Sequence, residues 1–200
     1  VSRLVRDGAI ELAPGMLGHV AFVDPSGGRG DAYTISIAHR EGQRIVCDLV
    51  RERRPPFDPG DVTLDYVQLA RAYGCHEVVG DRYAAGWVTQ EFERHRMPYR
   101  TCERTKSEIY LDALPLFTQG SIEIPDIPRL HVELTQLERR KLRCCRESVD
   151  HPVRSHDDLA NALCGAAVEL SSIPLAAPIT LRDYEFSRQL AAVAEFGETG

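Results

Sequence analysis

Aspartates stand at the ends of several apolar segments of this 200-residue chain, where a rigid element could hold them as ligands. Asp24 ends the segment VAFV, and Asp81 ends the segment VVG. A pair, Asp157 and Asp158, opens the segment LANALCGA. Carboxylate oxygens are the ligands that hard divalent cations such as Mg²⁺ prefer. If these residues converge in space, they would form a carboxylate metal site.

Each of these aspartates also has a purely local interpretation. Asp24 precedes Pro25 and a glycine-rich stretch, a combination that is typical of turns. Ser155 and Asp158 have the spacing of a capping box, so this Asp pair is also typical of a helix start. Successive helical residues point about 100° apart, so only one of Asp157 and Asp158 can face a site squarely.

The elements that would position these aspartates follow from the hydrophobic periodicity. Residues 19–24, 32–39 and 44–50 are predicted strands with short connections, which favours an antiparallel meander. Helices and strands alternate after the meander. The later strands are expected at 77–80, 99–102, 121–124 and 143–149. The helices are expected at 61–73, 84–96, 106–118, 129–142 and 155–170, with one more at 182–196 in the tail.

This order predicts an α/β fold with a mixed sheet, in which three antiparallel strands are followed by parallel strands and helices cover both faces. A helical crossover would lay 77–80 parallel to 19–24. If these strands are neighbours, Asp24 and Asp81 leave the same edge of the sheet. We expect one domain over 19–172, a lead-in over 1–18 and a tail over 173–200.

Composition limits the classes of function. The net charge of −6 argues against binding nucleic acid by bulk charge alone, although a local basic face stays compatible with it. No apolar run approaches the roughly 20 residues that span a bilayer, and no signal peptide is visible, so no membrane partner is expected. The 6 cysteines show no C-x-x-C spacing, which favours reduced core thiols over zinc ligands.

Five segments together carry a resemblance to a known family. They are VDPSGGRGDAYT, VVGDRYAAGWVTQEF, KSEIYLDALPLFTQGSIEIPD, LERRK and HDDLANALCGA. In this order they resemble the nuclease domain of the tailed-bacteriophage terminase large subunit, over residues 19–170. The resemblance implies a ribonuclease-H-like fold and an endonuclease that cuts concatemeric viral DNA during genome packaging. It also implies double-stranded DNA, the terminase ATPase domain, the small terminase subunit and the portal as partners, in the host-cell cytoplasm.

The resemblance assigns roles to the aspartates. Asp24 matches the family's acid on the first strand, Asp81 the acid on the fourth strand, and Asp158 the acid on the late helix. Asp31 and Asp157 match auxiliary acids of the same metal pocket. Phosphodiester cleavage needs a nucleophilic water and a stabilised leaving oxygen, and two divalent cations, Mg²⁺ or Mn²⁺, supply both. Asp24 follows the most apolar strand and is our choice for the bridging ligand.

Basic residues that could face DNA lie outside the acidic segments. Lys106 either contacts a DNA phosphate or only opens a helix. Arg139, Arg140 and Lys141 are typical of a solvated helix end, with phosphate contact as the alternative. No basic partner is evident in the sequence around the three main acids. We therefore expect them to repel one another without metal.

Other functions share this pattern of acids. One alternative is another ribonuclease-H-like nuclease, such as a junction resolvase or a transposase core. A second is a non-catalytic docking domain of a packaging motor. The chain has no G-x-x-x-x-G-K-[ST] phosphate loop, so we do not expect the ATPase motor within it. The start at Val1 fits an excised domain or a truncated reading frame.

Overall fold

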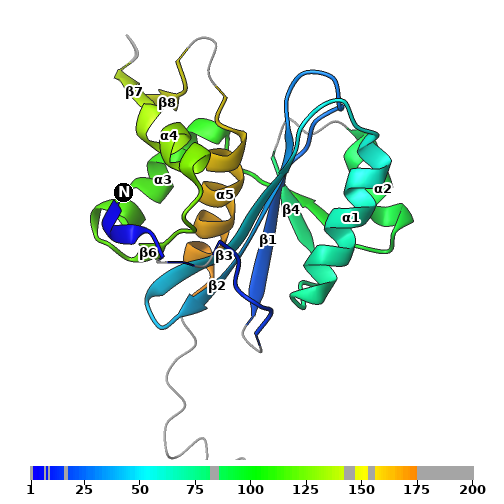
Figure 1. The fold of residues 1–200 in the computed structure, drawn as a ribbon, viewed down its shortest axis with the longest axis horizontal. Helices are drawn as coiled ribbons and strands as arrows, with labels where there is room; N and C mark the ends of the chain where they lie inside the picture. Colours follow the sequence, from blue (N-terminus) through cyan, green and yellow to red (C-terminus); the bar gives the residue numbers. More distant parts are fainter. Residues whose placement is uncertain are drawn as a thin grey trace, which may run out of the picture.

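A computed structural model describes residues 2–6, 8, 10–15, 18–81, 86–141, 147–152 and 156–174. At its centre is a six-stranded sheet with the order β5-β4-β1-β2-β3-β6 (Figure 1). Its strands are β1 (His19–Asp24), β2 (Tyr33–Glu41), β3 (Arg44–Arg53), β4 (Val78–Gly80), β5 (Tyr99–Thr101) and β6 (Ile122–Glu123). β1, β2 and β3 are antiparallel, whereas β4 pairs parallel to β1 and β5 parallel to β4. The predicted mixed sheet is confirmed.

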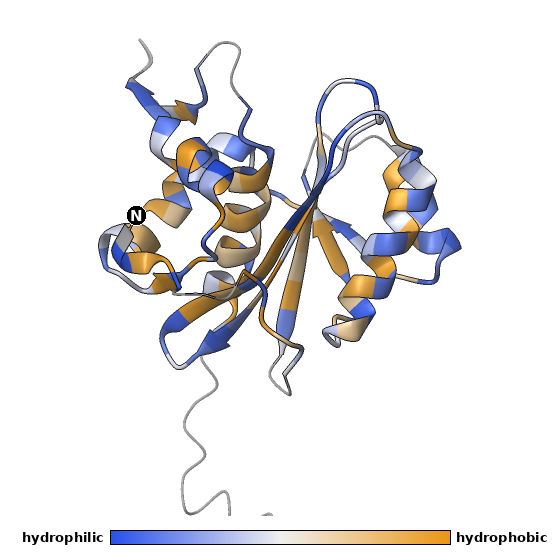
Figure 2. Ribbon diagram, viewed as in Figure 1, coloured by the Kyte–Doolittle hydropathy of each residue, from blue (hydrophilic) through white to orange (hydrophobic). Residues whose placement is uncertain are grey.

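Helices cover both faces of the sheet, as the sequence predicts (Figure 1). One face carries α1 (Pro59–Ala72) and α2 (Gly86–Arg94). The other face carries α3 (Lys106–Thr118), α4 (Pro128–Gln136) and α5 (Asp158–Ser172). Hydrophobic residues lie along the sheet and on the sides of the helices that face it (Figure 2). The sheet therefore separates two cores and serves as the rigid frame for residues at its edges.

The alternation of β2 explains the two cores. Tyr33, Ile35 and Ile37 belong to the core under α1 and α2. On the opposite face β2 presents small residues, which let α5 approach closely. Gly165 of α5 is the point of closest approach, because a Cβ there would lie 2.5 Å from the ring of Phe22. The sequence thus fixes α5 directly against β1 and β2.

The expected helix over 129–142 is wrong in its second half. α4 ends at Gln136, and Leu137 is already extended with ψ of 126°. Residues Glu138–Lys141 form β7, which pairs antiparallel with β8 (Glu147–Asp150). The ladder between these strands satisfies the backbone groups that a longer helix would have satisfied, and a local periodicity cannot reveal such a partner.

Other expectations meet the structure in different ways. In the lead-in, Leu4 joins the core and Val5 bridges to Ile124, so this segment packs on the domain. Four cysteines are buried and free, as expected: Cys47, Cys75, Cys102 and Cys164. The remaining two cysteines, residues 143–146 of one expected strand and the expected tail helix at 182–196 lie outside the described residues. Among the described helices, none is both long and apolar enough to cross a membrane.

Candidate metal centre

Asp24 and Asp81 end two neighbouring strands at the same edge of the sheet. β1 and β4 are parallel and adjacent, with Val23 in register with Gly80. The amide nitrogen of Asp81 donates to the carbonyl oxygen of Val23 at 3.1 Å, so the ladder reaches the aspartates themselves. The predicted convergence of these two acids is therefore present, and the sheet fixes both backbones.

Asp158 reaches the same edge from the first turn of α5. The Thr34 hydroxyl donates to the Asp158 carbonyl oxygen at 2.9 Å, which ties the start of α5 to β2. Thr34 is the register partner of Asp24, so Asp158 lies over the end of β1. Among the described residues, the buried Oδ2 atom of Asp158 makes no hydrogen bond. Nη2 of Arg129 lies 3.8 Å and Nδ1 of His156 lies 3.9 Å from this oxygen, beyond hydrogen-bond distance, so the oxygen is suited to a cation.

The capping box that the sequence offered cannot be followed at the start of α5. Ser155 lies outside the described residues, and the N-cap residue Asp157 makes no side-chain capping bond. Glu133 of α4 acts instead, since its Oε2 accepts the amides of Leu159 at 2.9 Å and Ala160 at 3.1 Å. A carboxylate on a neighbouring helix thus satisfies the donors of α5 and leaves Asp158 available.

Asn161 joins the acids, and the sequence analysis did not identify it. Its Nδ2 donates to Oδ2 of Asp24 at 2.8 Å and to Oδ2 of Asp81 at 3.0 Å. Asn161 lies three residues after Asp158, a spacing that puts both on one helix face, and this was the available signal. One amide therefore holds two carboxylates whose charges repel.

Lys106 lies among the acids, which corrects the expectation that they have no basic partner. Its Nζ donates to Oδ1 of Asp157 at 2.6 Å, and the Tyr110 hydroxyl donates to Oδ2 of Asp157 at 2.7 Å. Burial lowers the pKa of Lys106, but the charges of Asp24, Asp157 and Asp158 outweigh it, so the pKa is raised. The α3 residue that was expected at a helix start is therefore a fixed cation in the site.

The electrostatics of the metal-free site favour protonation of some acids. Burial raises the pKa of Asp24 to about 7, while the charge of Lys106 and the hydrogen bond from Asn161 act against this shift. Burial also raises the pKa of Asp158, again against the charge of Lys106. A cation bound here would restore the charged forms of these carboxylates.

Asp24 and Asp158 open onto a cavity of about 320 Å³, whose wall does not include Asp81. Asp24, Asp31, Lys106, Asp157 and Asp158 are part of its wall. Asp31 is exposed at the rim, where its Oδ1 lies 3.8 Å from Nδ1 of His156. A second cavity of about 710 Å³ shares Asp158 and His156 with the first, and Arg54 and Arg129 line it. The site is therefore open to a large substrate on the side of these arginines.

The predicted basic cluster does not join the acids. Arg139, Arg140 and Lys141 belong to β7, and neither Arg139 nor Arg140 lines the cavity of the acids. Arg139 and Arg140 are exposed, and Arg140 pairs with Glu138 at 2.7 Å. The hairpin is nevertheless close to the site, because the Ser107 hydroxyl accepts the Val149 amide at 2.9 Å, directly after Lys106.

The strand order and the helices on both faces are those of the ribonuclease-H-like fold that the sequence predicted. No family model and no curated protein matches this sequence. Solved structures match, among them the large terminase nuclease of thermophilic phage G20c, with TM-score 0.70 and 16% identity, covering 86% of this chain and 96% of that one. The nuclease domain from Thermus phage P74-26 matches with TM-score 0.62 and 16% identity, covering 82% and 90%.

The nuclease domain of the large terminase subunit gp2 of bacterial virus Sf6 also matches, with TM-score 0.55 and 17% identity, covering 82% of this chain and 91% of that one. The chain thus has the fold of phage large terminase nuclease domains. The matches include the G20c nuclease with bound magnesium and a variant Sf6 nuclease with manganese.

Proposed function

We propose that this chain is a metal-dependent endonuclease of the phage large terminase type, which cuts concatemeric viral DNA during packaging. The observation that carries the proposal is the convergence of Asp24, Asp81 and Asp158, from three separate elements, at one edge of the sheet. The shared fold with terminase nucleases, some of which were crystallised with magnesium or manganese, supports it.

Three acids are assigned to the metal under this proposal. Asp24, which ends β1 and shares Asn161 with Asp81, would bridge two ions. Asp81 and Asp158 would each hold mainly one ion, with Asp31 reaching the site from the rim through water. Two divalent cations, Mg²⁺ or Mn²⁺, would supply an activated water and stabilise the leaving oxygen of the phosphodiester.

The remaining polar groups would position the acids and the DNA. Both Asp157 oxygens already have protein donors, so its role would be to hold Lys106 rather than to bind metal directly. The Lys106 ammonium, held at the cavity, would contact the phosphate beside the acids. Arg129 and Arg54 would line the path of the DNA backbone, and Arg139, Arg140 and Lys141 would make outer phosphate contacts from the hairpin.

The wider role of the protein would follow from packaging. Its substrate would be double-stranded DNA in the host-cell cytoplasm, and its partners would be the terminase ATPase, the small terminase subunit and the portal. Contacts through phosphates and bound cations would make cleavage tolerant of sequence.

Incubation with supercoiled plasmid tests the proposal. With Mn²⁺ or Mg²⁺ we expect nicked and then linear DNA, and with EDTA we expect intact plasmid. An intact plasmid at high protein concentration with both metals would contradict the activity and favour a docking domain.

A further inference from the structure

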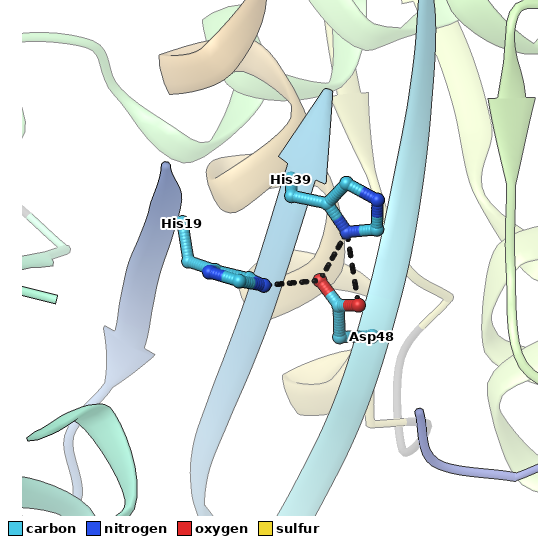
Figure 3. A group of neighbouring side chains, drawn as sticks. All are labelled: His19, His39 and Asp48. Atoms are coloured by element: carbon cyan, nitrogen blue, oxygen red, sulfur yellow. Dashed lines mark hydrogen bonds and ion pairs between the residues drawn. The ribbon is translucent and has the colours of Figure 1, made fainter. Parts of the chain in front are cut away.

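A second polar cluster lies at the opposite end of β1 from Asp24. It consists of His19 at the start of β1, His39 near the end of β2 and Asp48 of β3 (Figure 3). His19 and His39 are register partners, so their side chains emerge on the same face of the sheet. Nδ1 of His39 lies 2.8 and 2.9 Å from the two Asp48 oxygens, and Nε2 of His19 lies 3.7 Å from Oδ2.

A β-bulge directs Asp48 toward the two histidines. Ile37 pairs with Leu49 and Ala38 pairs with Cys47, so Asp48 is the extra residue between them. In a regular ladder, Asp48 would pair with one residue of β2. The residues of β3 on one side of it would then point to the opposite face of the sheet. Bulges often redirect one side chain at a functional position. The local irregularity of the sheet therefore coincides with the polar cluster.

The cluster is enclosed, which makes its charge balance important. The side chains of His19 and Asp48 are 1% exposed, and that of His39 is 7% exposed. A carboxylate that is withdrawn from water needs a cation or several donors. Asp48 is enclosed beside the two imidazoles, and the more exposed Glu41 adds a second carboxylate beside His39, so a divalent cation suits the cluster.

The donor atoms fit a transition metal better than magnesium. Two imidazole nitrogens and one carboxylate oxygen form a donor set that Zn²⁺ uses, whereas Mg²⁺ prefers oxygen ligands. Tetrahedral zinc with bonds of about 2.1 Å places its ligand atoms roughly 3.4 Å apart. The atoms of this cluster all lie within 4.8 Å of one another, so small side-chain shifts would reach that spacing.

His39 also has a second partner of the kind that supports a metal ligand. Its Nε2 lies 3.3 Å from Oε1 of Glu41, which leaves Nδ1 directed at Asp48 and His19. Histidines that bind metal commonly donate their other ring nitrogen to a carboxylate. An ion bound at Nδ1 would replace the hydrogen bond from Nδ1 to Asp48, and Nε2 would then carry the ring proton toward Glu41.

We propose that His19, His39 and Asp48 bind one divalent transition-metal ion of the zinc type, separate from the nuclease ions. Such an ion would join β1, β2 and β3 at the end of the sheet remote from Asp24. It would also secure the lead-in, because the Leu12 amide donates to the Asp48 carbonyl at 2.9 Å. Its metal preference would differ from that of the carboxylate site.

A second group with a histidine, formed by Asp150, His151 and Asp157, is a weaker candidate. The Lys106 ammonium lies 2.6 Å from Oδ1 of Asp157 and would compete with a cation there. This group also borders the carboxylate site, so the experiment must separate it from the proposed one.

Titration of the full chain with Co²⁺, followed by visible absorption, tests the proposal. The protein would carry Asp24→Asn and Asp158→Asn, which weaken binding at the carboxylate site. We expect one equivalent of Co²⁺ with the spectrum of a low-coordinate nitrogen site, displaced by Zn²⁺ and unaffected by excess Mg²⁺. His39→Gln in this background should abolish the spectrum, whereas His151→Gln and His76→Gln, an exposed control, should preserve it.

Several results would overturn the proposal. One is the absence of saturable Co²⁺ binding by the folded background protein, which would show that His39 and Asp48 form only a hydrogen-bonded pair. Another is binding that survives His39→Gln or disappears with His151→Gln. Should His39→Gln fail to fold, the melting temperature of the background protein decides: it should rise with Zn²⁺ and not with Mg²⁺, and an equal response to both, or none, would contradict the site.

Discussion

The two ends of β1 carry buried charged groups with different partners. At the carboxyl end, Asp24, Asp81 and Asp158 crowd one edge, with a single lysine ammonium among them. At the amino end, one carboxylate, Asp48, meets two imidazoles. The ends are five residues apart along the strand, about 17 Å at ~3.3 Å per residue. The carboxylate site, which is open to solvent, favours hard cations that exchange. The enclosed cluster of two histidines and Asp48 favours a tightly held ion or an ion pair.

The carboxyl end is also open where the amino end is closed. The acids border cavities of about 320 and 710 Å³, and Asp31 at the rim is exposed. The histidine cluster has no side chain more than 7% exposed among its three members. A reaction on DNA requires an open site such as the carboxyl end of β1. An enclosed cluster such as the one at the amino end is suited to stabilising the fold.

The largest effect is expected for Asp158→Asn. Removing a ligand of the metal should lower plasmid cleavage by on the order of 10³ or more, since metal ions supply several kcal/mol of transition-state stabilisation. Asp157→Asn should weaken cleavage by only about 10–100-fold, because it disturbs the position of Lys106. Asp65→Asn, at an exposed aspartate of α1, is the control and should cleave normally. The reverse order of Asp158 and Asp157 would mean that the other member of the pair is the ligand.

Asn161→Ala should reduce cleavage by about 10–100-fold at saturating DNA. The amide is the shared donor of Asp24 and Asp81, so its loss frees both carboxylates to move apart. Increasing the Mn²⁺ concentration should recover part of the rate, because the metal then replaces the lost donor. A rate equal to that of wild type would show that the sheet alone holds the two acids.

The metal-free protein should lose stability as the pH rises, and Asp24→Asn should reduce this loss. Asp24 has a pKa of about 7 in the folded state, above its ordinary value, so the folded state binds more protons than the unfolded state between those values. The contribution of Asp24 is therefore favourable below its ordinary pKa and declines as the pH rises through 7. Urea unfolding in EDTA at pH 5 and pH 8 should show a difference on the order of 1–3 kcal/mol, smaller in the variant.

With Mn²⁺, wild type should become more stable than Asp24→Asn. Metal binding to the native state stabilises wild type by mass action and the variant much less. If Asp24→Asn were less stable than wild type in EDTA at pH 8 and kept the full metal response, Asp24 would be a turn residue only.

The smallest effect is expected for Glu133→Gln. It keeps an acceptor for the α5 amides but loses the ion pair with Arg129, whose Nε lies 2.8 Å from Oε1 of Glu133. Burial raises the pKa of Glu133, which limits the loss. We expect the free energy of unfolding to fall by about 1 kcal/mol. Glu138→Gln, which removes an exposed pair with Arg140, should leave the free energy of unfolding unchanged, and an equal effect of both variants would show that the ion pair between Glu133 and Arg129 adds no stability.

Local patterns were sufficient for the frame of the site. Strand alternation and the helical crossover predicted β4 parallel to β1, and the structure adds that the two strands are neighbours, which places Asp24 beside Asp81. The aspartate at the start of α5 followed from helix periodicity. These features depend on neighbours a few residues apart, or on rules of chain connection that hold for most α/β sheets.

Contacts between distant segments could not be predicted in the same way. Lys106 meets Asp157 across 51 positions, and Glu133 caps α5 across 26 and 27 positions. The hairpin of β7 and β8 looked like the end of a helix, because its partner strand follows later. The histidine pair was partly visible, since an antiparallel hairpin places His19 opposite His39, but the bulge that adds Asp48 was not.

Cleavage of supercoiled plasmid by wild type and by Asp24→Asn, side by side with Mn²⁺ and with EDTA, tests the central claim most directly. The account predicts nicked and linear DNA only for wild type with Mn²⁺. Asp24→Asn should leave the plasmid intact while its circular dichroism spectrum matches that of wild type. Metal-dependent cleavage by the folded Asp24→Asn protein at the wild-type rate would contradict the assignment of the acidic sheet edge as the active site.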